Sequence, residues 1–351
     1  MSSKTNVNSN SGLAIMSRKA NAKSNSGLVN KLGSLIALAV LFVILTIATP
    51  SFLTATNIMN IFRQTSVNAL ISTGMLVCLI TAGIDLSVGA NAIFCTCMMG
   101  MMLQRGFTNP FLIILVGLVS GTVFGFINGT LLTRLHLPHP FVSTLGMKNV
   151  LWGLALVVVN SQIVSGFPAQ ITWLGEQALP NTIPVIGGFP VSFMLVIILF
   201  AVMSIFLHKT ILGRSIYCVG GNPEAARLSG IKSANVLTFC YTLSGFMSAL
   251  AGIVLIGRGG IANGANAIQP YDTDAIAACI IGGASFSGGK GTMSGTLIGA
   301  LIITVIRNGL QLLSVSTAIQ NIVVGLVIIL AVLIDVTRER MEANARRLAT
   351  K

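Results

Sequence analysis

The sequence has 351 residues, of which 54% are apolar and only 8% are charged, and its formal net charge is +13. An average soluble domain is about one quarter charged, so this composition excludes an ordinary soluble protein. Several uncharged apolar runs of about twenty residues predict an all-α, polytopic membrane protein. Loops and tails on the inner side of a membrane explain the excess of Lys and Arg, which therefore indicates no nucleic-acid partner.

The chain begins with a tail, residues 1–32, that is rich in Ser, Asn and Lys and contains SNSGL twice. This composition cannot bury an apolar core and predicts a disordered cytoplasmic tail, which we expect to be retained. Residues 33–336 are predicted to form the transmembrane domain, with a cytoplasmic loop at 209–233. Residues 337–351 are predicted to form a cytoplasmic C-terminal tail.

The apolar runs divide into ten predicted spans, with approximate limits 34–49, 62–82, 87–103, 110–133, 141–159, 190–207, 235–257, 274–287, 292–313 and 318–335. Ten is an even number, so both termini lie on the same side of the membrane. Placing both inside assigns nearly all loop and tail Lys and Arg to the cytoplasm and leaves Arg63, Arg105 and Arg258 outside. This asymmetry favours cytoplasmic termini.

Asp85 and Ser87 lie in the break GIDLSVG between the second and third spans. Two interpretations carry equal weight. Asp85 caps the N–H groups at the start of the third span, or it lines a polar pathway, because carboxylates within a membrane face protein or water. Both can hold together.

Glycines recur every four residues on the fourth span and again on the ninth, so each span presents a smooth stripe to a neighbouring backbone. The stripes consist of Gly117, Gly121, Gly125 and Gly129, and of Gly291, Gly295 and Gly299. Interrupted spans at matching positions also point to an internal repeat, spans 2–5 and 7–10. The odd offset of five spans predicts that the repeats are inverted.

A polar island, residues 220–231, interrupts the apolar sequence as GGNPEAARLSGI. Asn222 is a good N-cap, Pro223 suits a first helical position, Glu224 favours the positive end of the helix dipole, and Gly230 ends the helix. Taken alone, these local features favour an ordinary loop between helices rather than a helix that docks on a cytoplasmic partner. The rest of the chain reverses that preference.

The eighth span is weak and follows a segment with several glycines. Asp272 or Asp274, just after Tyr271, is expected to cap its N-terminus. Arg307 lies inside the ninth span and needs a partner or a water-filled cavity. Its candidate partners are the three carboxylates already named, and the sequence does not select among them.

The segment 284–292, ASFSGGKGT, fails as a phosphate-binding loop, since Ala284 and Gly291 replace the required Gly and Ser/Thr. The cysteines have no metal-binding or disulfide spacing, and no nucleophile–base pair is evident. The sequence thus predicts no catalytic residue, no metal site and no cofactor bound by this chain.

Several ordered motifs resemble one family, the membrane permease subunits of bacterial ABC importers for monosaccharides. The resemblance covers about residues 35–335 and is carried by 64–69 (QTSVNA), 83–89 (GIDLSVG), 220–230 (GGNPEAARLSG), 274–278 (DAIAA) with Gly282 and Gly283, 288–291 (GGKG) and 295–300 (GTLIGA). The chain combines motifs of the ribose-type and galactose-type permeases, so the resemblance does not assign the sugar.

The resemblance implies a bacterial inner-membrane subunit that imports a monosaccharide by alternating access. The implied partners are a cytoplasmic ABC ATPase holding ATP and Mg, an external sugar-binding protein, a second permease subunit (identical or related) and membrane lipid. It implies a coupling segment of Gly221, Asn222, Pro223, Glu224, Ala225, Ala226, Arg227, Leu228 and Gly230. We expect the sugar path to include Asp85, Ser87, Tyr271, Asp274 and Asn308.

Two alternatives come from other classes. Inverted repeats also build secondary transporters driven by ion gradients, which would use Asp85, Asp272 or Asp274 for coupling. A membrane scaffold without transport activity is the weaker alternative, and it would tolerate bulky residues at Gly121 or Gly295. Substitutions in the polar island, Glu224→Lys or Arg227→Glu, separate the ABC interpretation from the secondary transporter, whereas tolerance of Asp85→Ala would favour the scaffold.

Overall fold

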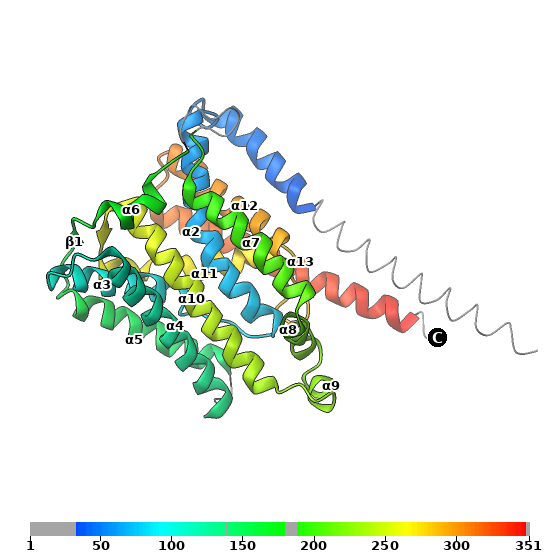
Figure 1. Ribbon diagram of the computed structural model, residues 1–351. Helices are drawn as coiled ribbons and strands as arrows, with labels where there is room; N and C mark the ends of the chain where they lie inside the picture. Colours follow the sequence, from blue (N-terminus) through cyan, green and yellow to red (C-terminus); the bar gives the residue numbers. More distant parts are fainter. Residues whose placement is uncertain (1–32, 136, 138, 180–187, 349–351) are drawn as a thin grey trace, which may run out of the picture.

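The computed structural model describes residues 33–348, apart from 136, 138 and 180–187, and nearly all of them are helical (Figure 1). The elements are a first helix Gly33–Ala48, α2 Ala55–Ile80, α3 Val88–Gln104, α4 Pro110–Arg134, α5 Pro140–Val158, β1 Val164–Ser165, α6 Ala169–Glu176, α7 Val191–Lys209, α8 Ile211–Gly221, α9 Pro223–Leu228, α10 Ser233–Gly259, β2 Ile261–Ala262, a 3₁₀ turn Gly264–Ile268, α11 Tyr271–Ile281, α12 Met293–Leu312 and α13 Thr317–Leu348.

The described helices occupy all ten predicted spans and confirm the all-α, polytopic fold. Six of these helices, α4, α5, α7, α10, α12 and α13, are long and apolar enough to cross a membrane. The eighth span is different. Helix α11 has 11 residues, which is a length of about 16 Å, and a bilayer core is about 30 Å thick. Its predicted limits, 274–287, were too long at the C-terminal end because Gly282 and Gly283 end the helix.

The first helix of each predicted repeat packs against the helices of the other repeat. Helix α2 packs against α11 and α12, and α10 packs against α3 and α4. The exchanged helices are antiparallel to each other, because Gly74 of α2 abuts Ser244 of α10, whereas Gln64 and Arg258 share a cavity nearer the opposite ends of the same pair. This reciprocal, antiparallel arrangement is the one expected of an inverted repeat.

Glycine contacts hold α10 against α4. A Cβ added to Gly121 would lie 2.8 Å from the Ala249 Cβ, and one added to Gly125 would lie 2.9 Å from the Gly245 Cα. On α12, an added Cβ at Gly295 or Gly299 would contact the backbone of α11 in the same way. Gly117 and Gly129 face Met99 and Thr238. Four of the stripe glycines, Gly125, Gly129, Gly295 and Gly299, therefore let neighbouring backbones touch. The prediction was wrong for Gly291, which lies before α12 because Thr292 is the N-cap of that helix, and which faces Leu76 and Ile80 of α2.

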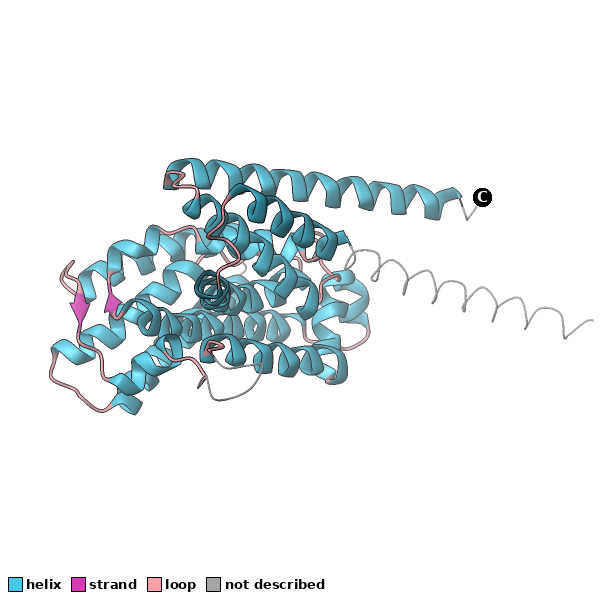
Figure 2. Cartoon of the chain, turned by 90° about the horizontal axis from the view of Figure 1, so that it is seen from above, coloured by secondary structure: helices cyan, strands magenta, loops and turns pink. Residues whose placement is uncertain are grey.

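The bundle has two distinct ends. Helices α8 and α9, the C-terminus of α2 and the loop between α11 and α12 gather at one end, called here the α9 end (Figure 1). The N-terminus of α2, the C-terminus of α10 and α6 form the opposite end. Helix α13 runs along the outside of the bundle and projects beyond it (Figure 2). The predicted N-terminal tail lies outside the described residues.

Candidate functional site

Helix α9 presents a short, capped surface at the end of the molecule. The Asn222 side chain accepts a hydrogen bond from the Ala225 N–H at 3.0 Å, so the predicted N-cap is confirmed. Gly230 follows the helix with a φ of +82°, a conformation that glycine adopts without strain. Ala226 is buried against the bundle, whereas Leu228 is 79% exposed. The capped helix thus exposes one large apolar side chain among polar ones.

The exposed face of α9 also carries an ion pair. Arg227 donates to Glu224 at 3.1 Å across one turn, and both side chains are mostly exposed. A pair of this kind stabilises a helix by well under about 1 kcal/mol. Both charges are therefore available to a partner.

Helix α8 leads directly into α9, and it was missed in the sequence, where the whole segment 209–233 was taken as a loop with one short helix. Thr210 caps its N-terminus by accepting from the Gly213 N–H at 3.0 Å. The Tyr217 hydroxyl donates to the Gly291 carbonyl at 2.8 Å. Burial raises the pKa of Tyr217 to about 12, which keeps this donor protonated. The cap at Thr210 and the helical spacing of the apolar residues, with Ile216 and Val219 three apart, were the available signals.

Asp85 lies at the centre of a network of hydrogen bonds within the bundle. One of its carboxylate oxygens accepts from the N–H and the hydroxyl of Ser87, at 3.1 and 2.6 Å. The other accepts from Ser244 of α10 at 2.8 Å. Asn128 of α4 donates to the Ser87 hydroxyl at 2.8 Å. Asp85 is 1% exposed, and neither cavity described below includes it.

Two helix N-termini meet beside this network. A Cβ on Gly89, in the first turn of α3, would lie 3.0 Å from the Tyr271 Cβ and 3.3 Å from the Asp272 N at the start of α11. Both N-termini carry the positive end of a helix dipole. Asp85 precedes one helix, and Asp272 and Asp274 lie in the first turn of the other. The three carboxylates thus offset the two dipoles.

The acidic residues of α11 form ion pairs, and the expectation that one of them is the N-cap was wrong. Pro270 occupies that position, without a side-chain cap. Asp272 accepts from Lys148 of α5 at 2.7 Å. Asp274 accepts two bonds of 2.6 Å from Arg307 of α12, which settles the partner that the sequence left open. Pairing with nearby cations outweighs capping, because a buried charge needs a counter-charge.

Asn308 pairs with Asn57 near the opposite end of the bundle. Each amide donates to the other's oxygen at 3.0 Å, and Asn57 also donates to the Phe52 carbonyl at 2.9 Å. Both residues are buried. Asn308 thus joins α12 to α2 and does not line either cavity.

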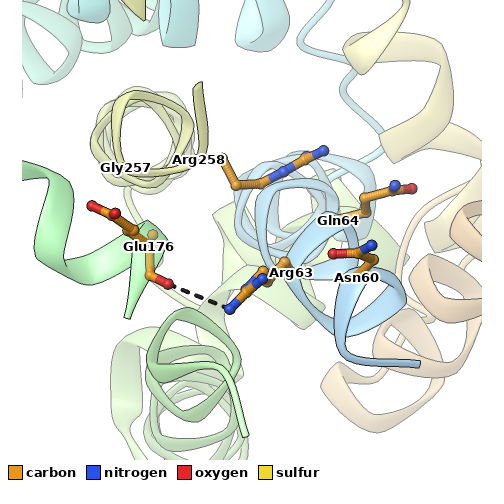
Figure 3. Close-up of a pocket in the computed structure, with 7 residues that line it drawn as sticks. Asn60, Arg63, Gln64, Glu176, Gly257 and Arg258 are labelled. Carbon is orange, nitrogen blue, oxygen red and sulfur yellow. Dashed lines mark hydrogen bonds between the residues drawn. The ribbon is translucent and has the colours of Figure 1, made fainter. Parts of the chain in front are cut away.

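A polar cavity of about 330 Å³ opens at the end opposite α9 (Figure 3). Arg63 of α2 and Arg258 of α10 both line it, together with Asn60, Gln64, Gly175, Glu176 and Gly257. Among the described residues, the Arg63 side chain donates one hydrogen bond, to the Glu176 carbonyl at 3.4 Å, and its Nε has no partner. The Arg258 side chain forms no hydrogen bond or ion pair within the described residues. Glu176 also lines the cavity, but among the described residues neither guanidinium group forms an ion pair with a carboxylate.

A second cavity of about 260 Å³ shares Gln64 and Arg258 with the first. It includes Tyr271 and Asp274, two of the five residues predicted for the sugar path, and Arg307. Amide side chains supply much of the remaining lining: Asn68, Gln269, Gln311 and Gln320. Amides donate and accept hydrogen bonds, as a ligand with many hydroxyl groups requires.

The structure therefore separates the predicted path residues. Tyr271 and Asp274 face a cavity, whereas Asp85, Ser87 and Asn308 are buried in contacts between helices. The amide side chains of the second cavity and the Arg63–Arg258 pair were not predicted as site residues. Gln64 and Asn68 lie in the motif 64–69, to which the resemblance gave no site role. The other residues lie outside the quoted motifs and come from segments far apart in the sequence.

The sequence matches the family described as "Branched-chain amino acid transport system / permease component" over residues 57–332. It is 41% identical to a ribose import permease protein of Bacillus subtilis (strain 168) over 306 residues, which cover 87% of this chain and 92% of that protein. It is 39% identical to the ribose import permease protein of Escherichia coli (strain K12), with 86% and 92% covered. The galactose/methyl galactoside import permease protein of the same strain is 35% identical, with 86% and 93% covered. No solved structure gives a significant match.

Proposed function

The chain belongs to the ABC importer permease family that includes these ribose and galactose permeases, and we propose that it carries a monosaccharide inward as the membrane-spanning subunit of an ATP-driven importer. The observation that carries this proposal is the similarity to sugar permeases, which extends over nearly the whole chain. The mixed motifs leave the identity of the sugar open. In this proposal the chain contributes the pathway, and a partner ATPase holds ATP and Mg.

Helix α9 is proposed to dock on the ATPase. Three features support this role: the helix is capped, it lies at one end of the bundle, and it exposes Leu228 beside the charges of Glu224 and Arg227. The excess of Lys and Arg in the same part of the sequence favours a cytoplasmic location for this end. Both termini are then cytoplasmic, in the inner membrane of a bacterium.

Alternating access is proposed to arise from movement of the two repeats about the junction of α3 and α11. The two ion pairs tie the start of α11 to both repeats, since Lys148 belongs to the first repeat and Arg307 to the second. The second cavity is the proposed entrance for the sugar, through Tyr271, Asp274 and the surrounding amides. Asp85, Ser87 and Asn308, by contrast, act as structural residues in this proposal.

The end opposite α9 is proposed to receive an external sugar-binding protein. Within the described part of the chain, Arg63 and Arg258 have no carboxylate partner there, and the sugars named for the relatives are uncharged. An acidic side chain of the binding protein would supply the missing counter-charge. A second permease subunit, identical or related, completes the proposed assembly within membrane lipid.

The ion-gradient alternative gains no support from these contacts. It requires a carboxylate that can exchange a proton or bind a cation, and Asp85, Asp272 and Asp274 each accept hydrogen bonds from neighbouring residues. Arginine and lysine already neutralise two of them.

Charge substitutions in α9 test the proposal. We expect Arg227→Glu to lower both the co-purification of the ATPase and sugar uptake at least tenfold. The double variant Glu224→Arg/Arg227→Glu restores an ion pair within α9 but inverts the charges presented to the partner. We expect ATPase co-purification and sugar uptake to remain low in this variant, because docking depends on where each charge lies on the helix surface. Arg105→Glu, at the opposite end, serves as the charge-matched control.

Recovery of uptake in the double variant would show that the pair serves only the helix itself. Near-normal co-purification and uptake in Arg227→Glu would contradict docking through α9.

A further inference from the structure

The glycine-rich loop between α11 and α12, which failed as a phosphate-binding loop in sequence, packs against the last turn of α8. Gly288 and Gly289 have φ angles of +79° and +67°, a region that favours glycine. The Gly289 N–H donates to the Ile80 carbonyl at the end of α2, at 2.8 Å. Tyr217 of α8 donates to the Gly291 carbonyl at 2.8 Å. Three elements are thus hydrogen-bonded together at the α9 end.

The contact between these elements is made mainly by backbone atoms. A Cβ added to Gly220, in the last turn of α8, would collide with the Ile80 carbonyl and lie 2.9 Å from the Gly289 N. A Cβ on Gly288 would lie 2.6 Å from the Gly220 carbonyl oxygen. One on Gly289 would lie 2.9 Å from the Gly221 Cα. A Cβ on Gly288 would also lie 2.9 Å from the Ala82 Cβ, so the contact consists of backbone atoms and one methyl group.

The position of this contact gives it a mechanical consequence. Asn222, two residues after Gly220, is both the C-cap of α8 and the N-cap of α9. On the other side, Ile80 ends α2, and the glycine loop leads through Thr292, the N-cap of α12, into that helix. A close-packed interior transmits displacement with little compression, and backbone contacts cannot yield by changing rotamers.

We propose that Gly220, Gly288 and Gly289 form a joint through which displacement of α9 moves α2 and α12. This glycine joint rests on the proposed function, because it assumes that an ATPase moves α9. It adds the route by which that movement reaches the repeats: α2 and α12 both contact the second cavity, through Gln64 and Arg307. The glycine joint thereby gives the glycine-rich loop a role that involves no nucleotide.

The test compares two glycines that differ in their surroundings. Gly220→Ala inserts a methyl group into the joint, whereas Gly153→Ala inserts one on α5, where no atom lies within 4 Å. Each variant is assembled with its native ATPase and binding protein in proteoliposomes. The readout is the number of sugar molecules imported per ATP hydrolysed. We expect Gly220→Ala to lower this ratio at least fivefold with the ATPase still bound, and Gly153→Ala to leave it unchanged.

Tyr217→Phe is the second variant, and it tests the glycine joint even if Gly220→Ala does not accumulate in the membrane. This variant removes one hydroxyl at the joint and adds no atom. We expect it to lower the import ratio about twofold to threefold. A purely structural role would reduce uptake and ATP hydrolysis together, with an unchanged ratio. An unchanged ratio in Tyr217→Phe, or in a well-assembled Gly220→Ala, overturns the joint.

The proposed function fails separately. It fails if the unaltered chain binds no ATPase or imports sugar without ATP.

Discussion

Asp274 and Arg307 hold the first turn of α11 to α12 through two hydrogen bonds of 2.6 Å. We predict that Asp274→Asn destabilises the chain strongly, because it leaves the Arg307 guanidinium without its counter-charge. The Arg307 side chain is 20% exposed and the Asp274 side chain 9%, so water compensates only part of the loss. Arg307 also keeps one bond to Asn321, at 3.1 Å.

The magnitude follows from the burial of the pair. Removing one partner of a buried ion pair costs about 3–5 kcal/mol. Because Arg307 keeps its bond to Asn321 and faces an open cavity, we expect Asp274→Asn to lower the free energy of unfolding by about 3 kcal/mol. At about 2 °C per kcal/mol for a large chain, the melting temperature should fall by about 6 °C. Arg307→Gln should act similarly, and the double variant Asp274→Asn/Arg307→Gln should cost less than the sum by about 2 kcal/mol.

The assay is thermal unfolding of the detergent-solubilised chain, followed by size-exclusion chromatography after heating. The control is Glu224→Gln, which breaks the exposed pair of α9 and should change the melting temperature by less than about 2 °C. Equal shifts for Asp274→Asn and Glu224→Gln would refute the reasoning. Additive effects in the double variant would refute the coupling of the pair.

Two further predictions concern packing and docking. Gly125→Leu should prevent accumulation of the folded chain, because its Cβ alone would lie 2.9 Å from the Gly245 Cα on α10. The size-matched control is Gly153→Leu on the open face of α5. Equal membrane levels of the two variants by immunoblot would contradict the packing argument. Arg63→Gln should lower uptake severalfold at limiting binding protein and much less at saturating binding protein, since it removes one unpaired charge at the docking end. Uptake that is reduced equally at both concentrations would argue against docking there.

Features with local signals could be predicted from the sequence. Each predicted span rests on a run of apolar residues, and the α9 helix rests on Asn222, Pro223 and Gly230, whose capping and turn chemistry is local. The glycine stripes predicted close helix contacts because spacing by four places residues on one face. The stripes do not say which helix they face.

Features that depend on tertiary convergence could not be predicted. Arg63 and Arg258 lie on helices far apart in the sequence, and only the antiparallel packing of α2 and α10 brings them into one cavity. The choice of Asp274 by Arg307 depends likewise on how α11 packs on α12. Asp85 looked equally suited to structure and to a pathway, and only its contact with Ser244 of α10 reveals its place in the network.

The short helix α11 could be predicted only in part from the sequence. Its glycines predicted an interrupted span, yet its start could not be placed, because Asp272 and Asp274 looked like caps. Their pairing with cations from two other helices decided their position. Local capping preference is worth about 1 kcal/mol and yields to a buried counter-charge.

The central claim is that this chain imports a sugar with energy from a partner ATPase. Its most direct test is to purify the chain from native membranes in mild detergent, identify every bound protein by mass, and measure uptake by the reconstituted assembly with and without ATP. We predict an ABC ATPase and an external sugar-binding protein in the assembly, and uptake that requires ATP. Uptake driven by an ion gradient in vesicles that lack ATP, with neither partner present, would contradict the claim.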